Sequence, residues 1–578
     1  MFANQASKVL ESLAGEYWEA RMANEPLYAT SLGDRRYDDR LGDITPLGRE
    51  RVRKLYESLL DRVEKLSEHE LTDEEKVTRA ALIVDLSQQI DYASFDLDEW
   101  CVDPLAGPQV EFFNIESYQP IRTFAEGQAM VRRWHAMQPY LRDRVANLRR
   151  GLASRKVAVL TCVKKALEET KESLKKPDAE WTMLRPLRVM HEDWSQEETR
   201  EFGEGIESAL RDSIRPALQA YSKFLESEIL SHARPDYAPG ISHLPDGSEC
   251  YGRLIRVHTS LNLTPEELHE VGLREVLQIN REMETLGKKL FDTTDRRDLL
   301  HRLRTDSSLY FASRDEVEEK ARSALARASS TISNWFGRIP EVRCEVVRMS
   351  DHEEKNSTTA YYRQPAADGS RPGRYYVNTS APETRPRYDA EVLAYHESIP
   401  GHHLQLAIAQ ELQGIPNFRK YSGVTAFVEG WGLYAERLAD EMGLYSSDMD
   451  RIGVLSYDAW RACRLVVDTG MHAKNWTRQE AIDFMLKNTA LAENNITNEV
   501  DRYITWPGQA LAYKVGQLEI LRLRDEAKRQ LGNNFDIRKF HDVLLGNGAV
   551  PLEVLQQIVA RYVKERNGSL SDGEDMGR

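Results

Sequence analysis

The sequence is poor in cysteine and has no long apolar run. Its five cysteines are scattered over 578 residues and none forms a C-x-x-C pair, which argues against a cysteine zinc site or a disulfide framework. The first residues, MFANQASKVLESLAGEYWEARM, carry charges throughout and lack the apolar core of a signal peptide. No later stretch reaches membrane-spanning length. We therefore predict a cytoplasmic protein with no membrane partner.

Basic residues are outnumbered in this chain. The chain has 78 Lys and Arg residues and 93 Asp and Glu residues, which gives a net charge of -15. Nucleic acids and anionic membranes bind basic surfaces, so the charge argues against a nucleic-acid partner. The shares of hydrophobic residues (41%) and charged residues (30%) are typical of a soluble globular enzyme. No oligomeric state is predicted.

Helical periodicity dominates the chain. Residues 49–70 and 263–290 place apolar side chains at spacings of three and four, and Thr264-Pro265 is a typical helix start. No Pro/Gly/Ser-rich linker divides the body. We predict a mainly α fold with an N-terminal helical lobe at residues 1–240, continuous with a catalytic lobe at 241–566. The polar residues 567–578 are predicted to form a disordered tail.

One region predicts β-structure. Residues 342–349, 358–363 and 374–378 are rich in β-branched and aromatic residues, and PAADGSRPG before the last of them is typical of a turn. The small sheet that they predict directly precedes the most unusual segment of the chain.

That segment, AYHESIPGHHLQ, holds three of the 14 histidines within eight residues. Zinc hydrolases commonly use H-E-x-x-H, which places two histidines on one face of a helix. Here Pro400 stands four residues after His396. A distorted turn at Pro400-Gly401 could bring either His402 or His403 back to that face. Glu397 is then the candidate general base.

A third ligand is expected from the helix predicted at Thr425–Gly443. Glu429 and Glu436 are seven residues apart and share one face of it. Gly430 and Gly432 weaken a helix by about 1 kcal/mol each relative to alanine. Close packing against the histidine segment is a reason to keep them.

The motifs HESIPGHHLQ, EGWGLYAERL, DTGMHAKNWT and VDRYITWPGQALAYKVGQ, in this order, resemble the bacterial domain of unknown function 885 (DUF885) family. That family is similar to the gluzincin metallopeptidases, and the resemblance covers most of the chain. It implies a large helical zincin-type metallopeptidase fold, related to angiotensin-converting enzyme and carboxypeptidase Taq, with a small β-sheet beside the zinc-binding helix. It also implies one Zn²⁺ per chain, held by His396, His402 and Glu429, with His402 favoured over His403.

Further candidates concern the substrate. We expect the strand at 374–378, with Tyr376 and Asn378, to be the edge strand that pairs with an extended peptide. His403 is a candidate for orienting a ligand or contacting substrate.

Other candidates lie near the C-terminus. Tyr503 or Tyr513 could stabilise an oxyanion, and His472 could donate to the same intermediate. Arg502 and Lys514 could bind a substrate carboxylate. The alternative for each of these residues is a buried structural hydrogen bond, although their grouping in one segment favours a shared site.

The predicted function is a zinc-dependent peptidase or amide hydrolase, in which Glu397 is the general base and the substrate is a peptide or small amide. One alternative is a non-catalytic helical binding protein with a structural zinc site. Another is a hydrolase of non-peptide amides or esters. Glu397 favours a hydrolase, since a structural site has no use for a base that is not a ligand.

Overall fold

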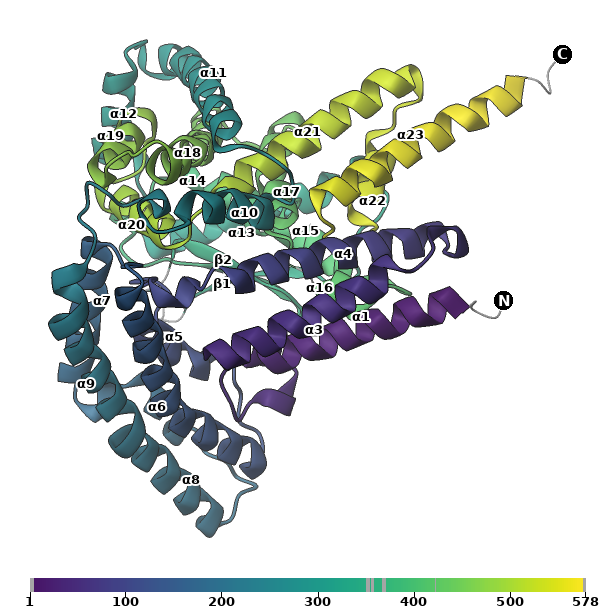
Figure 1. The fold of residues 1–578 in the computed structure, drawn as a ribbon. Coiled ribbons are helices and arrows are strands. Elements are labelled where there is room, and N and C mark those ends of the chain that lie inside the picture. The colour runs from purple at the N-terminus through teal and green to yellow at the C-terminus, as the bar shows by residue number, and fades with distance from the viewer. Residues whose placement is uncertain (1–4, 350–353, 355–357, 366–370, 422, 575–578) are drawn as a thin grey trace.

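The computed structural model describes residues 5–349, 354, 358–365, 371–421 and 423–574. Over these residues the chain is mainly helical, with a single three-stranded sheet near its centre (Figure 1). This confirms the predicted mainly α class and the small sheet.

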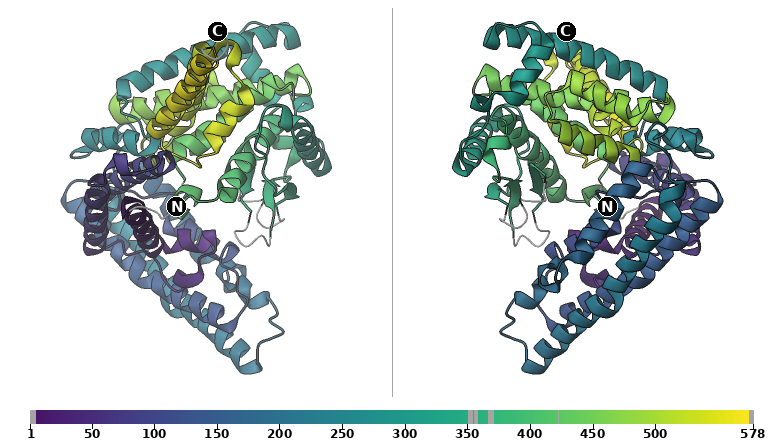
Figure 2. Two further views of the ribbon diagram at one scale, coloured as in Figure 1. Left: turned by 90° about the vertical axis from the view of Figure 1, so that its right-hand side faces the viewer. Right: turned by 90° about the vertical axis from the view of Figure 1, so that its left-hand side faces the viewer.

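The N-terminal helices form two groups. The first group consists of α1 (Gln5–Asn24), α2 (Pro26–Leu32), α3 (Pro46–Glu64) and α4 (Asp73–Ser94). The second consists of α5 (Pro108–Asn114), α6 (Phe124–Ala153), α7 (Leu160–Lys175), α8 (Gln196–Ala209) and α9 (Arg215–Phe224). This second group has its own core around Trp134 and Trp181. It extends away from the rest of the molecule, and we call it the arm (Figure 2).

The first group is integrated with the rest of the chain. Val77 and Val84 of α4 belong to the same apolar core as residues of the C-terminal helices. Conversely, Phe418 packs in the core of α1, α3 and α4. Residues 1–240 thus contribute to more than one apolar core, and the first helical group shares its core with later parts of the chain.

The remaining helices surround the sheet and cover one another (Figure 1). They are α10 (Gly247–Thr259), α11 (Pro265–Phe291), α12 (Arg296–Thr305), α13 (Arg314–Thr331), α14 (Asp389–Glu397), α15 (His402–Glu411), α16 (Asn417–Tyr421), α17 (Thr425–Glu441), α18 (Asp448–Ala473), α19 (Arg478–Asn488), α20 (Glu493–Thr505), α21 (Leu511–Leu531), α22 (Ile537–Leu545) and α23 (Leu552–Glu574). α11 packs along α18, and α17 packs along α21.

The helix ends follow the sequence signals. Thr264 accepts a hydrogen bond from the Glu267 N–H and caps α11, as its position before Pro265 predicts. Gly443, with φ +69°, follows the end of α17. The last helix, however, continues to Glu574, into the segment for which a disordered tail is predicted from 567; residues 575–578 lie outside the described part.

The strands are β1 (Cys344–Arg348), β2 (Ala360–Arg363) and β3 (Gly373–Val377). Their order is β1-β3-β2, with β1 parallel and β2 antiparallel to β3. β3 is thus the central strand, and the prediction that residues 374–378 form an edge strand is wrong. Most of the predicted PAADGSRPG turn, residues 366–370, lies outside the described residues.

Candidate metal centre

The histidine segment is divided by a sharp turn. α14 ends at Glu397 and α15 begins at His402, with the non-helical residues Ser398 and Gly401 at their ends. A Cβ on Gly401 would lie 1.9 Å from the carbonyl oxygen of His396, so only glycine fits. Trp431 of α17 donates its indole N–H to the Pro400 carbonyl at 2.9 Å. The predicted distortion at Pro400-Gly401 is therefore confirmed.

The turn brings His396 and His402 together with Glu429. One potential ligand atom from each residue lies within 4.8 Å of the other two. Oε2 of Glu429 is 3.7 Å from Nε2 of His396 and 3.7 Å from Nε2 of His402. Zinc binds such atoms at about 2.0–2.2 Å, so two atoms at this separation can both reach one ion. The donor set fits zinc.

His403 does not join this cluster. Its Nδ1 accepts from the Tyr362 hydroxyl at 2.9 Å, and its Nε2 donates to the Val342 carbonyl at 3.2 Å. Both ring nitrogens are thereby used to attach α15 to the sheet region. The geometry favours His402 as the second ligand, while the substrate contact predicted for His403 stays a prediction.

Glu429 and Glu436 lie on one face of α17 and approach different ring nitrogens of His396. Glu436 is buried, and its Oε1 lies 2.8 Å from Nδ1 of His396. Burial lowers the pKa of His396, but Glu429 and Glu436 outweigh this effect and raise it to about 9. Burial and the charge of His396 lower the pKa of His402 to about 4. The two glutamates thus favour positive charge at His396.

Two glycines explain why α17 can pack closely against His396 and against α21. A Cβ on Gly432 would lie 2.6 Å from Cε1 of His396, so the imidazole occupies the space of a side chain. A Cβ on Gly430 would lie 2.4 Å from the Cα of Gly516 on α21. The E-G-W-G sequence therefore places α17 against the histidine on one side and against α21 on the other.

Glu397 lies beside the cluster without belonging to it. Burial raises the pKa of its carboxyl to about 7, and the Glu429 charge adds to the increase. The His396 and Arg461 charges and the Tyr362 backbone N–H act in the opposite direction. A carboxyl group with this pKa can both accept and return a proton near neutral pH.

The sheet faces this centre with residues other than the predicted ones. Tyr375 is buried. Burial raises the pKa of its hydroxyl group, and the charge of Glu397 raises this pKa further. Tyr376 belongs to the opposite face, where its ring stacks on Tyr361 at 4.9 Å. Asn378 donates its amide to the carbonyls of Glu354 and Thr358. Both side chains therefore have partners within the sheet region, and the substrate contacts predicted for them stay predictions.

His472 and Lys514 are held in internal bonds. Nδ1 of His472 accepts from the Ile241 N–H at 3.1 Å, and its Nε2 donates to the Tyr503 carbonyl at 2.9 Å. The buried Lys514 ammonium lies 2.6 Å from Asp458 and 3.0 Å from Glu275. The structure thus gives internal partners to both side chains, and their predicted roles toward a substrate stay predictions.

Glu499 is the shared partner of two other predicted residues. The Tyr503 hydroxyl donates to it at 2.6 Å, and Arg502 donates to it at 3.1 Å. Arg464 in turn donates to the Tyr503 oxygen at 2.9 Å. These bonds engage the Tyr503 hydroxyl proton and give Arg502 a structural partner, and the roles predicted for both residues stay predictions.

Tyr513 differs from Tyr503. Within the described residues its hydroxyl has no hydrogen-bond partner, while the Arg464 guanidinium lies 4.3 Å from its ring centroid. Burial raises the pKa of Glu429, but the bond to His396 and the charges of His402, His396 and Arg464 outweigh this effect and lower the pKa to about 2. Arg464 therefore connects Tyr513 with the metal ligand.

Polar residues of α18 are missing from the sequence prediction. Tyr457, Arg461, Arg464 and Asp468 are all buried in a mostly apolar helix. Their spacing of four, three and four residues places them on one helical face. Such a polar stripe on an otherwise apolar helix is a signal that the sequence does contain.

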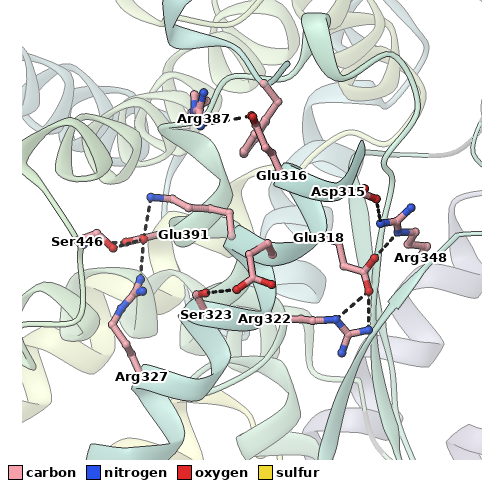
Figure 3. A pocket seen from close by; sticks show the side chains of 13 residues that line it. Asp315, Glu316, Glu318, Arg322, Ser323, Arg327, Arg348, Arg387, Glu391 and Ser446 are labelled. Carbon is pink, nitrogen blue, oxygen red and sulfur yellow. Dashed lines mark hydrogen bonds and ion pairs between the residues drawn. The ribbon is translucent and has the colours of Figure 1, made fainter. Parts of the chain in front are cut away.

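A separate groove of about 810 Å³ lies over α13 (Figure 3). Its floor is Glu391, which binds Lys320 at 2.9 Å, Arg327 at 2.6 Å and the Ser446 N–H at 2.9 Å. Arg387 and Arg348 at its rim also pair with acidic residues of α13. None of the candidate metal ligands lines the groove, and its charges are compensated within it.

The chain is similar to several known structures, two of which are described here. One is a protein from Colwellia psychrerythraea described as a "putative lipoprotein", with 27% identity and a TM-score of 0.88, over 96% of this chain and 99% of that one. The other is a "putative lipoprotein of unknown function" from Shewanella oneidensis, with 18% identity and a TM-score of 0.74, over 96% and 100%. The second shows likeness of fold alone.

No curated protein matches the chain significantly. No helix of the described residues combines the length and the apolar character needed to cross a membrane. The family described as "Bacterial protein of unknown function (DUF885)" matches residues 26–559. This match spans nearly all of the helices and the sheet described above, and the chain therefore belongs to the DUF885 family.

Proposed function

We propose that this chain is a zinc-dependent amide hydrolase of the zincin type, similar to gluzincin metallopeptidases, that acts on short peptides. The observation that carries the proposal is the meeting of His396, His402 and Glu429, with Glu397 beside them. Catalytic zinc sites commonly combine three protein ligands of this kind with an open position.

A bound zinc ion would polarise the scissile carbonyl and lower the pKa of the attacking water. Glu436 orients His396 so that Nε2 faces Glu429. Glu397 accepts a proton from the water and returns it to the leaving amine, as its pKa of about 7 permits. Tyr513 is the hydroxyl that can donate to the carbonyl oxygen as negative charge develops there.

The sheet supplies a place for an extended substrate. Among the described residues, β2 pairs only with β3, so its other edge is open to a further strand. The Tyr362 N–H on this strand points to the Glu397 carboxylate. A peptide added along β2 would run past the proposed base, which is the recognition mode expected of an edge strand.

Two alternatives use the same residues. A structural zinc site normally closes with four protein ligands, whereas the described cluster has three. A hydrolase of non-peptide amides or esters would use the same chemistry as a peptidase, and only the cleaved bond would differ.

We keep a cytoplasmic location as part of the proposal, on the basis of the scattered cysteines. The two similar structures are described as "putative" lipoproteins, so membrane attachment is the competing possibility. Fractionation of the native host, with detection of this chain in the soluble and membrane fractions, decides between them.

The function is tested by elemental analysis of the purified chain, followed by hydrolysis of a peptide library and a panel of simple amides and esters. We expect about one zinc per chain and cleavage of peptides that stops with a chelator and resumes with zinc. A chain that binds no transition metal after reconstitution would refute the proposal. Zinc binding without hydrolysis of any panel member would support the binding-protein alternative.

A further inference from the structure

Arg461 is a buried guanidinium with few partners. Its side chain is 6% exposed. Within the described residues it donates one hydrogen bond, to the Tyr457 carbonyl at 3.4 Å, and its Nε is buried without a partner. A guanidinium carries five N–H donors, and buried donors are nearly always satisfied. This arginine therefore has unused binding capacity.

The guanidinium lies next to the candidate metal centre. Its Nη2 is 3.8 Å from Oε1 of Glu436, the same oxygen that contacts His396 at 2.8 Å. Its charge also acts on Glu397 and His402, whose pKa values it lowers. Arg461 thus lies beside the carboxylate that contacts His396, the first candidate ligand.

Aromatic rings hold Arg461 in place. The guanidinium lies 4.5 Å from the Tyr457 ring centroid and 4.2 Å from that of Trp460. Cation–π contacts of this kind fix the orientation of a guanidinium while leaving its N–H edges available.

A second arginine adds positive charge at the same side. Arg464 lies 4.4 Å from the Trp460 ring centroid, and one of its nitrogens, Nη1, is buried without a partner. Arg464 and Arg502 share the single carboxylate of Glu499. The guanidinium of Arg464 therefore lies beside that of Arg461, with the Trp460 ring in contact with both.

We propose that Arg461 binds a carboxylate of the substrate, so that the enzyme acts on short peptides or N-acyl amino acids with a free carboxylate close to the scissile amide. The inference rests on the proposed function. Arg461 takes the part that the sequence assigns to Arg502 and Lys514, whose side chains have internal partners. A guanidinium can hold a carboxylate by two parallel hydrogen bonds, which a lysine cannot do.

Dicarboxylates provide a test that needs no known substrate. Succinate and glutarate can place one carboxylate on zinc and the other on Arg461, whereas succinamate and glutaramate lack the second charge. Binding to the zinc-loaded chain is measured by calorimetry. We expect at least one dicarboxylate to bind about 10- to 100-fold more tightly than its monoamide, as a charge-assisted pair would provide.

Variants test whether Arg461 causes this preference for dicarboxylates. Arg461→Gln should abolish it, while Arg451→Gln, an exposed arginine on the same helix paired with Asp440, should leave it unchanged. If Arg461→Gln loses its fold or its zinc, Arg461→Lys takes its place and should retain only a reduced preference. Once a cleaved peptide is found, Arg461→Gln should lower kcat/KM more for the free acid than for its C-terminal amide.

The outcomes separate the two proposals. A wild-type chain without zinc would overturn the proposed function itself. A zinc-loaded chain that binds both dicarboxylates no better than their monoamides would overturn only the assignment of Arg461. The same holds if the full preference survives in Arg461→Gln or Arg461→Lys, or if free-acid and amide peptides lose activity equally, because Arg461 would then only position Glu436.

Discussion

Oε1 of Glu436 lies 2.8 Å from Nδ1 of His396, on the ring nitrogen opposite to the one that faces Glu429. This contact fixes the ring orientation and leaves Nε2 free for a metal. Histidine ligands commonly donate their second nitrogen to a carboxylate, which increases their basicity. The two glutamates of α17 are therefore not interchangeable.

Glu436→Gln should weaken zinc binding about 10- to 100-fold, the usual effect of removing such a partner. Competition with a chromophoric chelator measures the change. Glu441→Gln, on the last turn of the same helix and paired with Arg524, is the control and should bind zinc like the wild type. Equal affinities for all three proteins would show that Glu436 does not orient a ligand.

His402→Ala and His403→Ala should have different effects, the first on zinc binding and the second on stability. The first removes a candidate ligand and should abolish tight zinc binding. The second removes two hydrogen bonds to Tyr362 and Val342 and should mainly lower the free energy of unfolding, by about 1–3 kcal/mol. Zinc content and urea unfolding of both variants check this, and loss of zinc from His403→Ala alone would reverse the ligand assignment.

Glu397→Gln keeps the shape of the side chain but cannot accept a proton. Since general-base catalysis contributes about 10²- to 10⁴-fold, kcat should fall by at least this factor while zinc content stays unchanged. The assay uses a peptide found by library screening. A glutamine variant as fast as the wild type would show that Glu397 is not the base.

Gly432→Ala should disturb His396 directly, because the new Cβ would lie 2.6 Å from the ring. Overpacking of this kind costs about 1–3 kcal/mol of stability, and zinc affinity should fall with it. Gly252→Ala is the matched control, since no atom lies within 4 Å of the new Cβ in α10. There the helix should gain up to about 1 kcal/mol, as chemical unfolding can measure.

Asp389 predicts a pH dependence of stability. Burial raises the pKa of its carboxyl from 3.8 to about 8, and Oδ1 has no hydrogen-bond partner. The folded chain therefore holds a proton that the unfolded chain releases at lower pH. The stability from this group is complete below pH 3.8 and is lost as the pH rises through 8.

Asp389→Asn should remove this dependence. The free energy of unfolding of the wild type should fall relative to the variant between about pH 4 and pH 8, since only the wild type has to bury a charge or retain a proton. Parallel urea titrations at several pH values measure the difference. A constant difference over this range would mean that Asp389 titrates normally in the folded chain.

Much of the local structure is predictable from the sequence. The cap at Thr264, the end of α17 near Gly443, the three strands and the break at Pro400-Gly401 all depend on neighbouring residues, and the structure contains each of them. The order of the strands is not local. β3 lies between β1 and β2 because of pairings that the sequence does not specify, so an edge could not be assigned to it.

The roles of individual side chains are hard to predict from the sequence for a related reason. Alternation shows that Tyr375 and Tyr376 face opposite ways, but only packing determines that Tyr375 faces Glu397. Lys514 has suitable chemistry for a carboxylate, yet Asp458, on another helix, already binds it. By contrast, the His396, His402 and Glu429 cluster depends on a motif and a family resemblance, and the structure brings these residues together.

The contact between Gly430 and Gly516 limits how the length of this chain can vary. An inserted residue moves the rest of a helix by about 1.5 Å and turns it by about 100°. Within α17 such a change would put a side chain in the place of Gly430 and would carry Glu429 away from His396. Within α21 it would put a side chain in the place of Gly516, where a Cβ would lie 1.8 Å from the Ala426 carbonyl oxygen. Insertions and deletions should therefore be tolerated in the segments that connect α17 through α18, α19 and α20 to α21, and rejected within 426–432 and 513–517.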